Sequence, residues 1–163
     1  MPSIGDVRFR VATGADVPAM AQCRLVDPAG GPADERMSAY FAGQHHPHQA
    51  LLPRIGYIAL AADSVAGYVA GHLTTRHACA GEVQYLFVAS AYRRRGIGTA
   101  LLRLLADWFQ KQAAAKVCVC VNPDSPAAEP FYRSLGASPF RRYWYAWDDI
   151  GVLVADTARH DTG

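Results

Sequence analysis

The segment that most constrains the fold is residues 83–105, VQYLFVASAYRRRGIGTALLRLL. An apolar run gives way to three consecutive arginines, then to Gly-Ile-Gly and to a leucine-rich stretch. In and just after that stretch, apolar residues recur with the period of a helix: Leu101, Leu102, Leu104, Leu105, Trp108 and Phe109. The pattern predicts a strand, a short glycine-containing loop and a helix that packs one face on a sheet.

The loop between this strand and this helix has the properties of an anion site. The first backbone amides of a helix have no partner within it and carry partial positive charge, so they bind anions. Gly96 and Gly98 let a ligand approach the backbone. Arg93, Arg94 and Arg95 add attraction at longer range. The sequence therefore predicts a diphosphate-binding loop.

Two common nucleotide-binding motifs do not fit this loop. A mononucleotide P-loop requires a lysine directly after its last glycine, and none stands there. A Rossmann fingerprint requires a third glycine where this chain has Leu101. The order of arginine before glycine therefore indicates another class of diphosphate site.

Composition bounds the class of protein. The chain has 163 residues, 51% hydrophobic and 18% charged, which suits one globular domain over residues 1–163, with a core at about 7–154 and a polar tail at 155–163. A formal net charge of +2 with clustered arginines argues against a nucleic-acid partner. We see no membrane-spanning run and no signal peptide, so we expect a cytoplasmic protein without membrane contact.

Hydrophobic periodicity and turn residues predict a mixed order of elements, β-α-α-β-β-β-α-β-α-β. We expect strands near residues 7–13, 56–61, 65–74, 82–88 and 116–121, and helices near 16–24, 33–41, 99–114 and 131–135. Residues 43–54 read as irregular, and residues 138–154 as extended and aromatic. The predicted fold class is α/β, with strands and helices mixed in one domain.

The loop resembles that of a known family. Arg93-x-x-Gly96-x-Gly98 is similar to the [Q/R]-x-x-G-x-[G/A] pyrophosphate loop of the GNAT superfamily of N-acetyltransferases. Family members place an apolar strand before this loop, a leucine-rich helix after it, and then a motif similar to Tyr132-x-x-x-Gly136. The resemblance covers about residues 57–140, and the first fifty residues match only in the order of elements.

This resemblance implies a fold and a cofactor. The fold would be a central mixed, mostly antiparallel sheet flanked by helices, with splayed middle strands. The co-substrate would be acetyl-CoA, with its pyrophosphate on the loop and its pantetheine arm along the strand at residues 82–88. The cofactor-binding residues so implied are Leu86, Phe87, Val88, Arg93, Arg94, Arg95, Gly96, Ile97, Gly98, Thr99 and Asn122.

Acetyl transfer from a thioester to an amine requires a neutral amine, a stabilised oxyanion and a proton for the leaving thiolate. By the resemblance, Tyr132 protonates the thiolate, a role that suits a neutral phenol. A backbone amide near Val88 would meet the oxyanion. These two groups would act on the thioester side of the reaction.

The amine side requires a base. Glu82 is the candidate, on the expectation that it shares a strand face with Leu86 and Val88. Gln84 would orient a water molecule, and His72 is the alternative base. The catalytic residues predicted are therefore Tyr132 as acid and Glu82 as base.

One position departs from the family pattern. Asn122 usually lies closer in sequence to the tyrosine, and here the segment NPDSPAAEP lengthens the loop between them. Asn122 is thus expected either to contact the cofactor or only to end its strand, with Ser125 or Asp124 taking over the contact.

Other reactive side chains do not indicate a metal. His45, His46 and His48 lack the spacing of a helical metal site and have no carboxylate nearby in sequence. Cys118 and Cys120 fall on one face of a predicted strand, as small buried residues do. We expect no metal cofactor.

The segment FRRYWYAW at residues 140–147 is more aromatic than a plain edge strand needs. It indicates stacking on a planar acceptor, or burial against a second subunit in a homodimer formed through this strand.

The favoured function is acetyl-CoA-dependent N-acetyl transfer to a primary amine, by direct attack in a ternary complex. Two alternatives stay open: a non-catalytic acyl-CoA sensor that kept the loop, and a transferase that uses another acyl-CoA. The acceptor is a small-molecule amine or a peptide amine. The sequence does not decide between these, because the segments expected to hold the acceptor match the family least.

Overall fold

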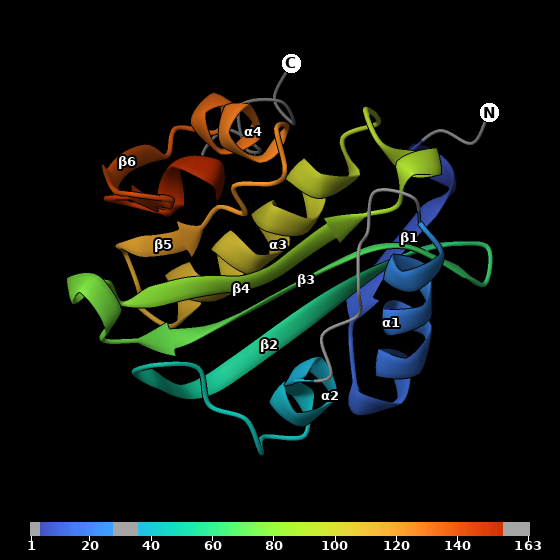
Figure 1. Cartoon of the computed structure of the whole chain (residues 1–163), viewed down its shortest axis with the longest axis horizontal. Coiled ribbons are helices and arrows are strands. Elements are labelled where there is room, and N and C mark those ends of the chain that lie inside the picture. Colours follow the sequence, from blue (N-terminus) through green and yellow to red (C-terminus); the bar gives the residue numbers. More distant parts are fainter. Residues whose placement is uncertain (1–3, 28–35, 155–163) are drawn as a thin grey trace.

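The computed structural model describes residues 4–27 and 36–154, which form a seven-stranded sheet with helices on both faces (Figure 1). The strands are β1 (Val7–Val11), β2 (Ala50–Ala61), β3 (Ser64–Thr74), β4 (Gly81–Val88), β5 (Val117–Cys120), β6 (Ser138–Arg141) and β7 (Trp144–Trp147). The helices are α1 (Val17–Val26), α2 (Arg36–Phe41), α3 (Ile97–Lys111) and α4 (Ala128–Ser134). The strands follow the order β1-β2-β3-β4-β5-β7-β6, and every neighbouring pair is antiparallel except β4 and β5. The predicted fold class, a mixed and mostly antiparallel sheet flanked by helices, is confirmed.

Two apolar cores cover the two faces of the sheet. α3 packs on one face through the stripe expected from the sequence, including the fully buried Leu101, Leu105 and Phe109. α1 and α2 pack on the other face, where Met20 and Tyr40 are fully buried. Burial of each large apolar side chain contributes about 1.5–3 kcal/mol, so both helical layers hold the central strands in place.

A bulge in β4 decides which of its side chains meets which core. The register between β3 and β4 shifts by one residue, and Gln84 is left without a partner in β3. Val83 packs in the α3 core before the bulge, and Leu86 packs toward the same core after it. A regular strand would send residues 83 and 86 to opposite faces, so the bulge inverts the alternation.

The bulge makes one expectation wrong. Glu82 does not share a face with Leu86 and Val88, which pack toward α3. Glu82 lies beside His72 on the opposite face, where Tyr85 packs against α2. The physical reason is the extra residue in β4, which a reading of strict alternation does not contain.

β4 and β5 are paired only where they begin. Residues 81–83 of β4 lie opposite residues 117–119 of β5, while β4 itself continues to Val88. Beyond the bulge at Gln84, residues 85–88 of β4 pair with β3 on one side and leave their other edge open. The splayed middle strands implied by the sequence resemblance are therefore present.

The remaining differences from prediction lie mainly at element ends. β2 begins at Ala50, inside a segment expected to be irregular, because its register against β3 shifts around Pro53 and accommodates the proline. α3 begins at Ile97 and α4 at Ala128, each slightly earlier than expected. The aromatic C-terminal segment folds into the β6–β7 hairpin, which adds one strand to the predicted order.

Some expectations fall outside the described range. The first residues of the helix expected at 33–41 and the polar tail at 155–163 are among them. Within the part of the chain that the structure describes, no helix has the length and apolar character that crossing a membrane requires.

Candidate active site

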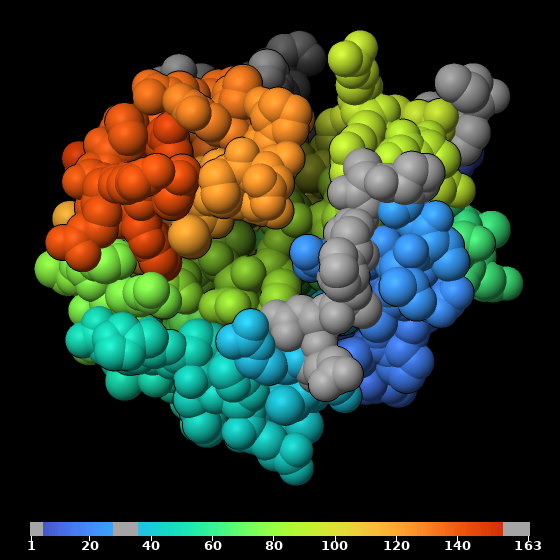
Figure 2. Space-filling model, viewed as in Figure 1, coloured from blue at the N-terminus to red at the C-terminus, as the bar shows by residue number. Residues whose placement is uncertain are grey.

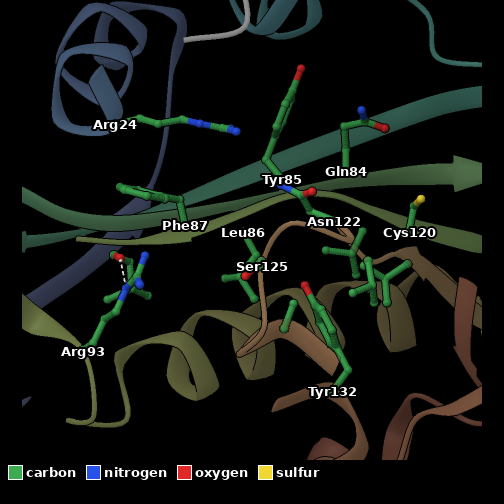
Figure 3. Close-up of a pocket in the computed structure, with 15 residues that line it drawn as sticks. Arg24, Gln84, Tyr85, Leu86, Phe87, Arg93, Cys120, Asn122, Ser125 and Tyr132 are labelled. Carbon is green, nitrogen blue, oxygen red and sulfur yellow. Dashed lines mark hydrogen bonds between the residues drawn. The ribbon is translucent and has the colours of Figure 1, made fainter. Parts of the chain in front are cut away.

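A cavity of about 260 Å³ opens where β4 and β5 part. Figure 2 shows a hollow between the orange atoms around α4 and the blue atoms of α1, with green atoms at its floor. Its lining, much of which Figure 3 labels, consists of Arg24, Val83, Gln84, Tyr85, Leu86, Phe87, Val88, Arg93, Val119, Cys120, Val121, Asn122, Ser125, Ala128 and Tyr132. The cavity thus joins α1, β4, β5 and the segment that leads into α4.

The loop before α3 reaches this cavity through Arg93. The Arg93 Nε donates a hydrogen bond of 2.9 Å to the carbonyl oxygen of Val88, and its guanidinium lies 6.0 Å from the ring centre of Phe87. Arg94 and Arg95 are not among the lining residues, and the guanidinium of Arg95 lies 5.6 Å from the ring centre of Tyr92.

The first turn of α3 presents backbone rather than side chains. Gly96 has a left-handed backbone with φ of 83°, which glycine adopts without strain. The amide of Ala100 donates to the carbonyl of Gly96, so the amides before Ala100 have no partner within the helix. The side chain of Ile97 packs in the core, and a methyl group on Gly98 would lie 3.5 Å from Val88 Cγ2, an ordinary contact. Thr99 follows in the same turn and is half-buried.

Tyr132 enters the cavity from α4. Its side chain is 6% exposed and packs edge-on against the rings of Phe131 and Trp147, with ring centres 5.2 and 5.9 Å away. The hydroxyl points into the cavity (Figure 3), and no described residue forms a hydrogen bond with it. Burial raises the pKa of the Tyr132 phenol, so it stays protonated near neutral pH and is able to donate a proton.

Glu82 lies behind the cavity rather than in its lining. The residue is 3% exposed, with Oε2 3.3 Å from His72 Nε2 and Oε1 3.8 Å from a guanidinium nitrogen of Arg76. His72 is fully buried, and its Nδ1 is hydrogen-bonded to the Tyr40 hydroxyl at 3.0 Å. Tyr40 in turn contacts the ring of Tyr85, a lining residue, at 5.5 Å between ring centres. The two bases considered from the sequence therefore form one buried chain, Tyr40–His72–Glu82.

Asn122 uses its side chain within its own turn. Its Oδ1 accepts a hydrogen bond of 2.9 Å from the backbone amide of Asp124, and its carbonyl accepts one from the amide of Ser125. Asn122 and Ser125 line the cavity, whereas Asp124 does not. The longer loop thus brings both Asn122 and Ser125 to the site.

The sequence model of the Acetyltransferase (GNAT) family matches residues 24–137, which is more than half of the chain. The chain belongs to the GNAT family. The matched region contains the loop before α3, the parted strands and Tyr132, and it begins at Arg24.

Solved structures share the GNAT fold of this chain. A GNAT-family structure from Desulfovibrio desulfuricans superposes with a TM-score of 0.71 and 17% identity, covering 88% of this chain and 99% of that one. The ribosomal-protein-S18-alanine N-acetyltransferase of Escherichia coli gives 0.61 and 19%, over 86% of this chain and 88% of that one. At these identities the likeness shows the fold alone.

Two curated relatives are similar over shorter stretches. Mycothiol acetyltransferase of Corynebacterium diphtheriae is 36% identical over 78 residues, 45% of this chain and 25% of that protein. The uncharacterized N-acetyltransferase YobR of Bacillus subtilis is 29% identical over 65 residues, 40% of this chain and 26% of that protein. The chain thus spans about a quarter of the length of the curated relatives it matches.

Sequence reasoning did not assign several lining residues of this GNAT domain to the site, Arg24 and Cys120 among them. Arg24 reaches the cavity from α1, and Cys120 reaches it from the end of β5. Burial raises the pKa of the Cys120 thiol, which keeps it protonated near neutral pH. No local motif marks either residue, because each is brought to the site by packing between distant segments.

The histidine segment and the cysteines have structural contacts. Arg54 donates to the carbonyl oxygen of His45 and contacts the Nδ1 of His46, both at 2.8 Å. The four cysteines are free thiols: Cys79 and Cys118 are buried, whereas Cys120, at the end of β5, is exposed, so its expected burial is wrong. Within residues 4–27 and 36–154, no three side chains of the His, Cys, Asp or Glu type gather closely enough to hold a metal ion.

The aromatic hairpin is divided between core and surface. Trp144, Tyr145 and Trp147 are buried within the chain, whereas Phe140 and Tyr143 are each 42% exposed. Three of the five aromatic residues in this segment are therefore buried within the chain. A homodimer through this hairpin stays a prediction.

Proposed function

We propose that this chain transfers an acetyl group from acetyl-CoA to a primary amine, by direct attack in a ternary complex. The observation that carries the proposal is the Tyr132 hydroxyl, which points without a described partner into a cavity between parted strands (Figure 3). A site of this form suits a thioester group held at its end and an amine that approaches from the opposite side.

The chain offers a fitting place for acetyl-CoA. The cofactor supplies an activated acyl group as a thioester. The unpaired amides of the first turn of α3 suit its pyrophosphate, and the open edge of β4 suits the amide groups of its pantetheine arm. The residues proposed to hold it are Leu86, Phe87, Val88, Arg93, Arg94, Arg95, Gly96, Ile97, Gly98, Thr99 and Asn122.

Tyr132 is proposed as the general acid. Its phenol has a pKa raised by burial, so the proton is present at neutral pH. In the balanced reaction one N–C bond forms and one C–S bond breaks, the amine loses a proton, and the sulfur gains one from Tyr132. A backbone amide near Val88 would stabilise the oxyanion.

Glu82 is proposed as the base, acting together with His72. Glu82 lies on the face of β4 that carries Tyr85, away from the α3 face. Because it does not line the cavity, the proton would reach it through water oriented by Gln84. His72 is 3.3 Å from the carboxylate and would share the proton.

The acceptor is proposed to be a small-molecule amine or a peptide amine. Among the structures with this fold, one is named for ribosomal protein S18 alanine and another, the NatC complex, was solved with a Gag peptide and CoA. The proposal extends amine acceptors from those proteins to this chain. A cytoplasmic location and the homodimer are further predictions from the sequence.

The test is acetyl-CoA-dependent thiol release across a panel of amines, beside a calorimetric titration of CoA. We expect CoA binding, and thiol release with at least one class of amine. Tight CoA binding without thiol release from any amine would favour the non-catalytic sensor. Faster release with a longer acyl-CoA would reassign the donor.

A further inference from the structure

α1 brings a cationic side chain to the cavity from a fixed position. Arg24 lies one helical turn after Met20, which is fully buried against the sheet. Three residues later, the carboxylate of Asp27 accepts hydrogen bonds from the backbone amide and the hydroxyl of Ser90, at 2.6 and 2.7 Å. Arg24 thus lies between two anchors, one in α1 and one at the residue that follows the helix.

Arg24 and Tyr132 lie on opposite sides of the cavity. In Figure 3, Arg24, Gln84 and Tyr85 occupy one side of β4, and the Tyr132 hydroxyl points in from the other. Gln84 reaches the side of Tyr85 because of the bulge in β4. A guanidinium, an amide and a phenol all carry hydrogen-bond donors, so this side of the cavity, which we name the Arg24 cluster (Arg24, Gln84 and Tyr85), suits an anion.

The charge of the lining supports the same conclusion. Among the described lining residues the charged side chains are Arg24 and Arg93, and none is an aspartate or a glutamate. Glu82, the nearest buried carboxylate in β4, is paired with His72 and Arg76 outside the lining. A plain ammonium ion would be repelled by such a site. A cation beside an amine also favours the neutral, nucleophilic form of that amine.

We propose that the acceptor is an amine that also carries an anionic group, a carboxylate or a phosphate, and that Arg24 selects it. The proposal rests on the N-acetyl transfer proposed above. The guanidinium forms two parallel hydrogen bonds to a carboxylate or phosphate, which fixes the acceptor's orientation as well as its charge. Arg24 is therefore a specificity-determining residue that acts on binding of the acceptor, at a distance from the acid Tyr132.

The first experiment uses matched acceptors with the full chain. α-Amino acids, their carboxamides, their decarboxylated amines and the corresponding aminophosphonates are compared in a thiol-release assay. The variants are Arg24→Gln and Arg24→Lys. The control is Arg8→Gln, which changes an exposed residue on the surface. The carboxylate and phosphonate arms decide which anion is preferred.

We expect kcat/KM to favour acceptors with an anionic group by about 10- to 100-fold, as one or two charge-assisted hydrogen bonds imply. Arg24→Gln should remove this preference by raising the acceptor KM, with the acetyl-CoA KM unchanged. Arg24→Lys should keep part of it, and Arg8→Gln all of it. A wild type that prefers the neutral amines, or an Arg24→Gln effect on acetyl-CoA alone, would overturn the proposal.

A second measurement separates this proposal from the transfer reaction itself. The CoA complex is titrated calorimetrically with N-acetylated amino acids. This titration measures binding of the anionic group without turnover. Binding that is lost in Arg24→Gln supports the proposal, and absence of binding to the wild type overturns it. No thiol release with any acceptor, together with Arg24-dependent binding, would reject the transfer reaction and keep the anion site.

Discussion

The two ends of β4 are built differently although one strand forms both. At residues 81–83 the strand is paired with β3 and β5, and the buried Glu82 meets His72 within the fold. At residues 84–88 the strand has no partner in β5; residues 85–88 are paired with β3 alone, Gln84 forms the bulge, and the free edge borders the cavity. We refer to these as the closed end and the open end. At the closed end the carboxylate of Glu82 lies within ion-pair distance of His72 and Arg76, whereas the open end borders the cavity.

Two buried tyrosines show the same contrast. Burial raises the pKa of both Tyr40 and Tyr132. The Tyr40 hydroxyl is hydrogen-bonded to His72, near the closed end. The Tyr132 hydroxyl faces the cavity and has no partner among the described residues. Of these two buried tyrosines, Tyr40 therefore has a hydrogen-bond partner within the fold, whereas the hydroxyl of Tyr132 is free to meet a ligand.

The largest effect is expected from removing the hydroxyl of one tyrosine near each end of β4. Tyr132→Phe should lower turnover by roughly 10²–10⁴, the usual contribution of a general acid, with CoA affinity and thermal stability nearly unchanged. Tyr40→Phe is the matched control and should lower the free energy of unfolding by about 1 kcal/mol, with a far smaller effect on turnover. Thiol release and thermal unfolding measure the two quantities. Equal turnover in wild type and Tyr132→Phe would remove Tyr132 as the acid.

A second test addresses the closed end. Glu82→Gln leaves His72 and Arg76 without their carboxylate, so we expect a loss of about 1–3 kcal/mol in stability. If Glu82 is also the base, the acidic limb of the pH–rate profile should disappear. Asp107→Asn, at an exposed pair on α3, is the control and should change neither. Lower stability with an unaltered pH–rate profile would confine Glu82 to a structural role.

A third test addresses the proposed pyrophosphate site in the first turn of α3. Gly98→Asp places a carboxylate in the first turn of α3, and we expect CoA affinity to fall by about tenfold or more through like-charge repulsion. Gly98→Ala is the control, because its methyl group would make only an ordinary contact with Val88. Calorimetric titration of both variants gives the comparison. An unchanged affinity in Gly98→Asp would place the pyrophosphate elsewhere.

The smallest effect concerns high pH. Because burial raises the pKa of Tyr132 above the ordinary value of about 10, the protonated phenol should persist as the pH rises to that value. Turnover is therefore expected to rise or level off between pH 7 and about 10, as the acceptor amine becomes neutral. A fall in wild-type turnover within this range that is absent from Tyr132→Phe would show that the phenol ionises early, contrary to the burial seen at the open end.

Much of the structure around the open end of β4 was predictable from the sequence. The helical spacing from Leu101 to Phe109 fixes the buried face of α3, and this spacing is local. The same holds for the glycines before α3, since Gly96 adopts the left-handed conformation that glycine permits. Tyr132 was predicted from its motif, and it does lie in the cavity lining.

The rest depended on packing between distant segments. The bulge at Gln84 has no marker in the sequence, and it moved Glu82 to the face opposite Leu86. Arg24 lies more than fifty residues before β4 and meets it only in the folded protein. β2 extends through Pro53 because its pairing with β3 shifts there, which a propensity reading treats as a break. Single-residue shifts of register and long-range contacts are therefore where the sequence was least informative.

We propose that the open end of β4 and the first turn of α3 together bind acetyl-CoA. Amide hydrogen exchange tests this directly, with and without acetyl-CoA, because it reads each end of the strand separately. We expect new protection in residues 84–88 and 96–99, with no change in residues 81–83, which are already paired with β5. Protection that appears at the closed end, or in neither segment at saturating acetyl-CoA, would contradict it.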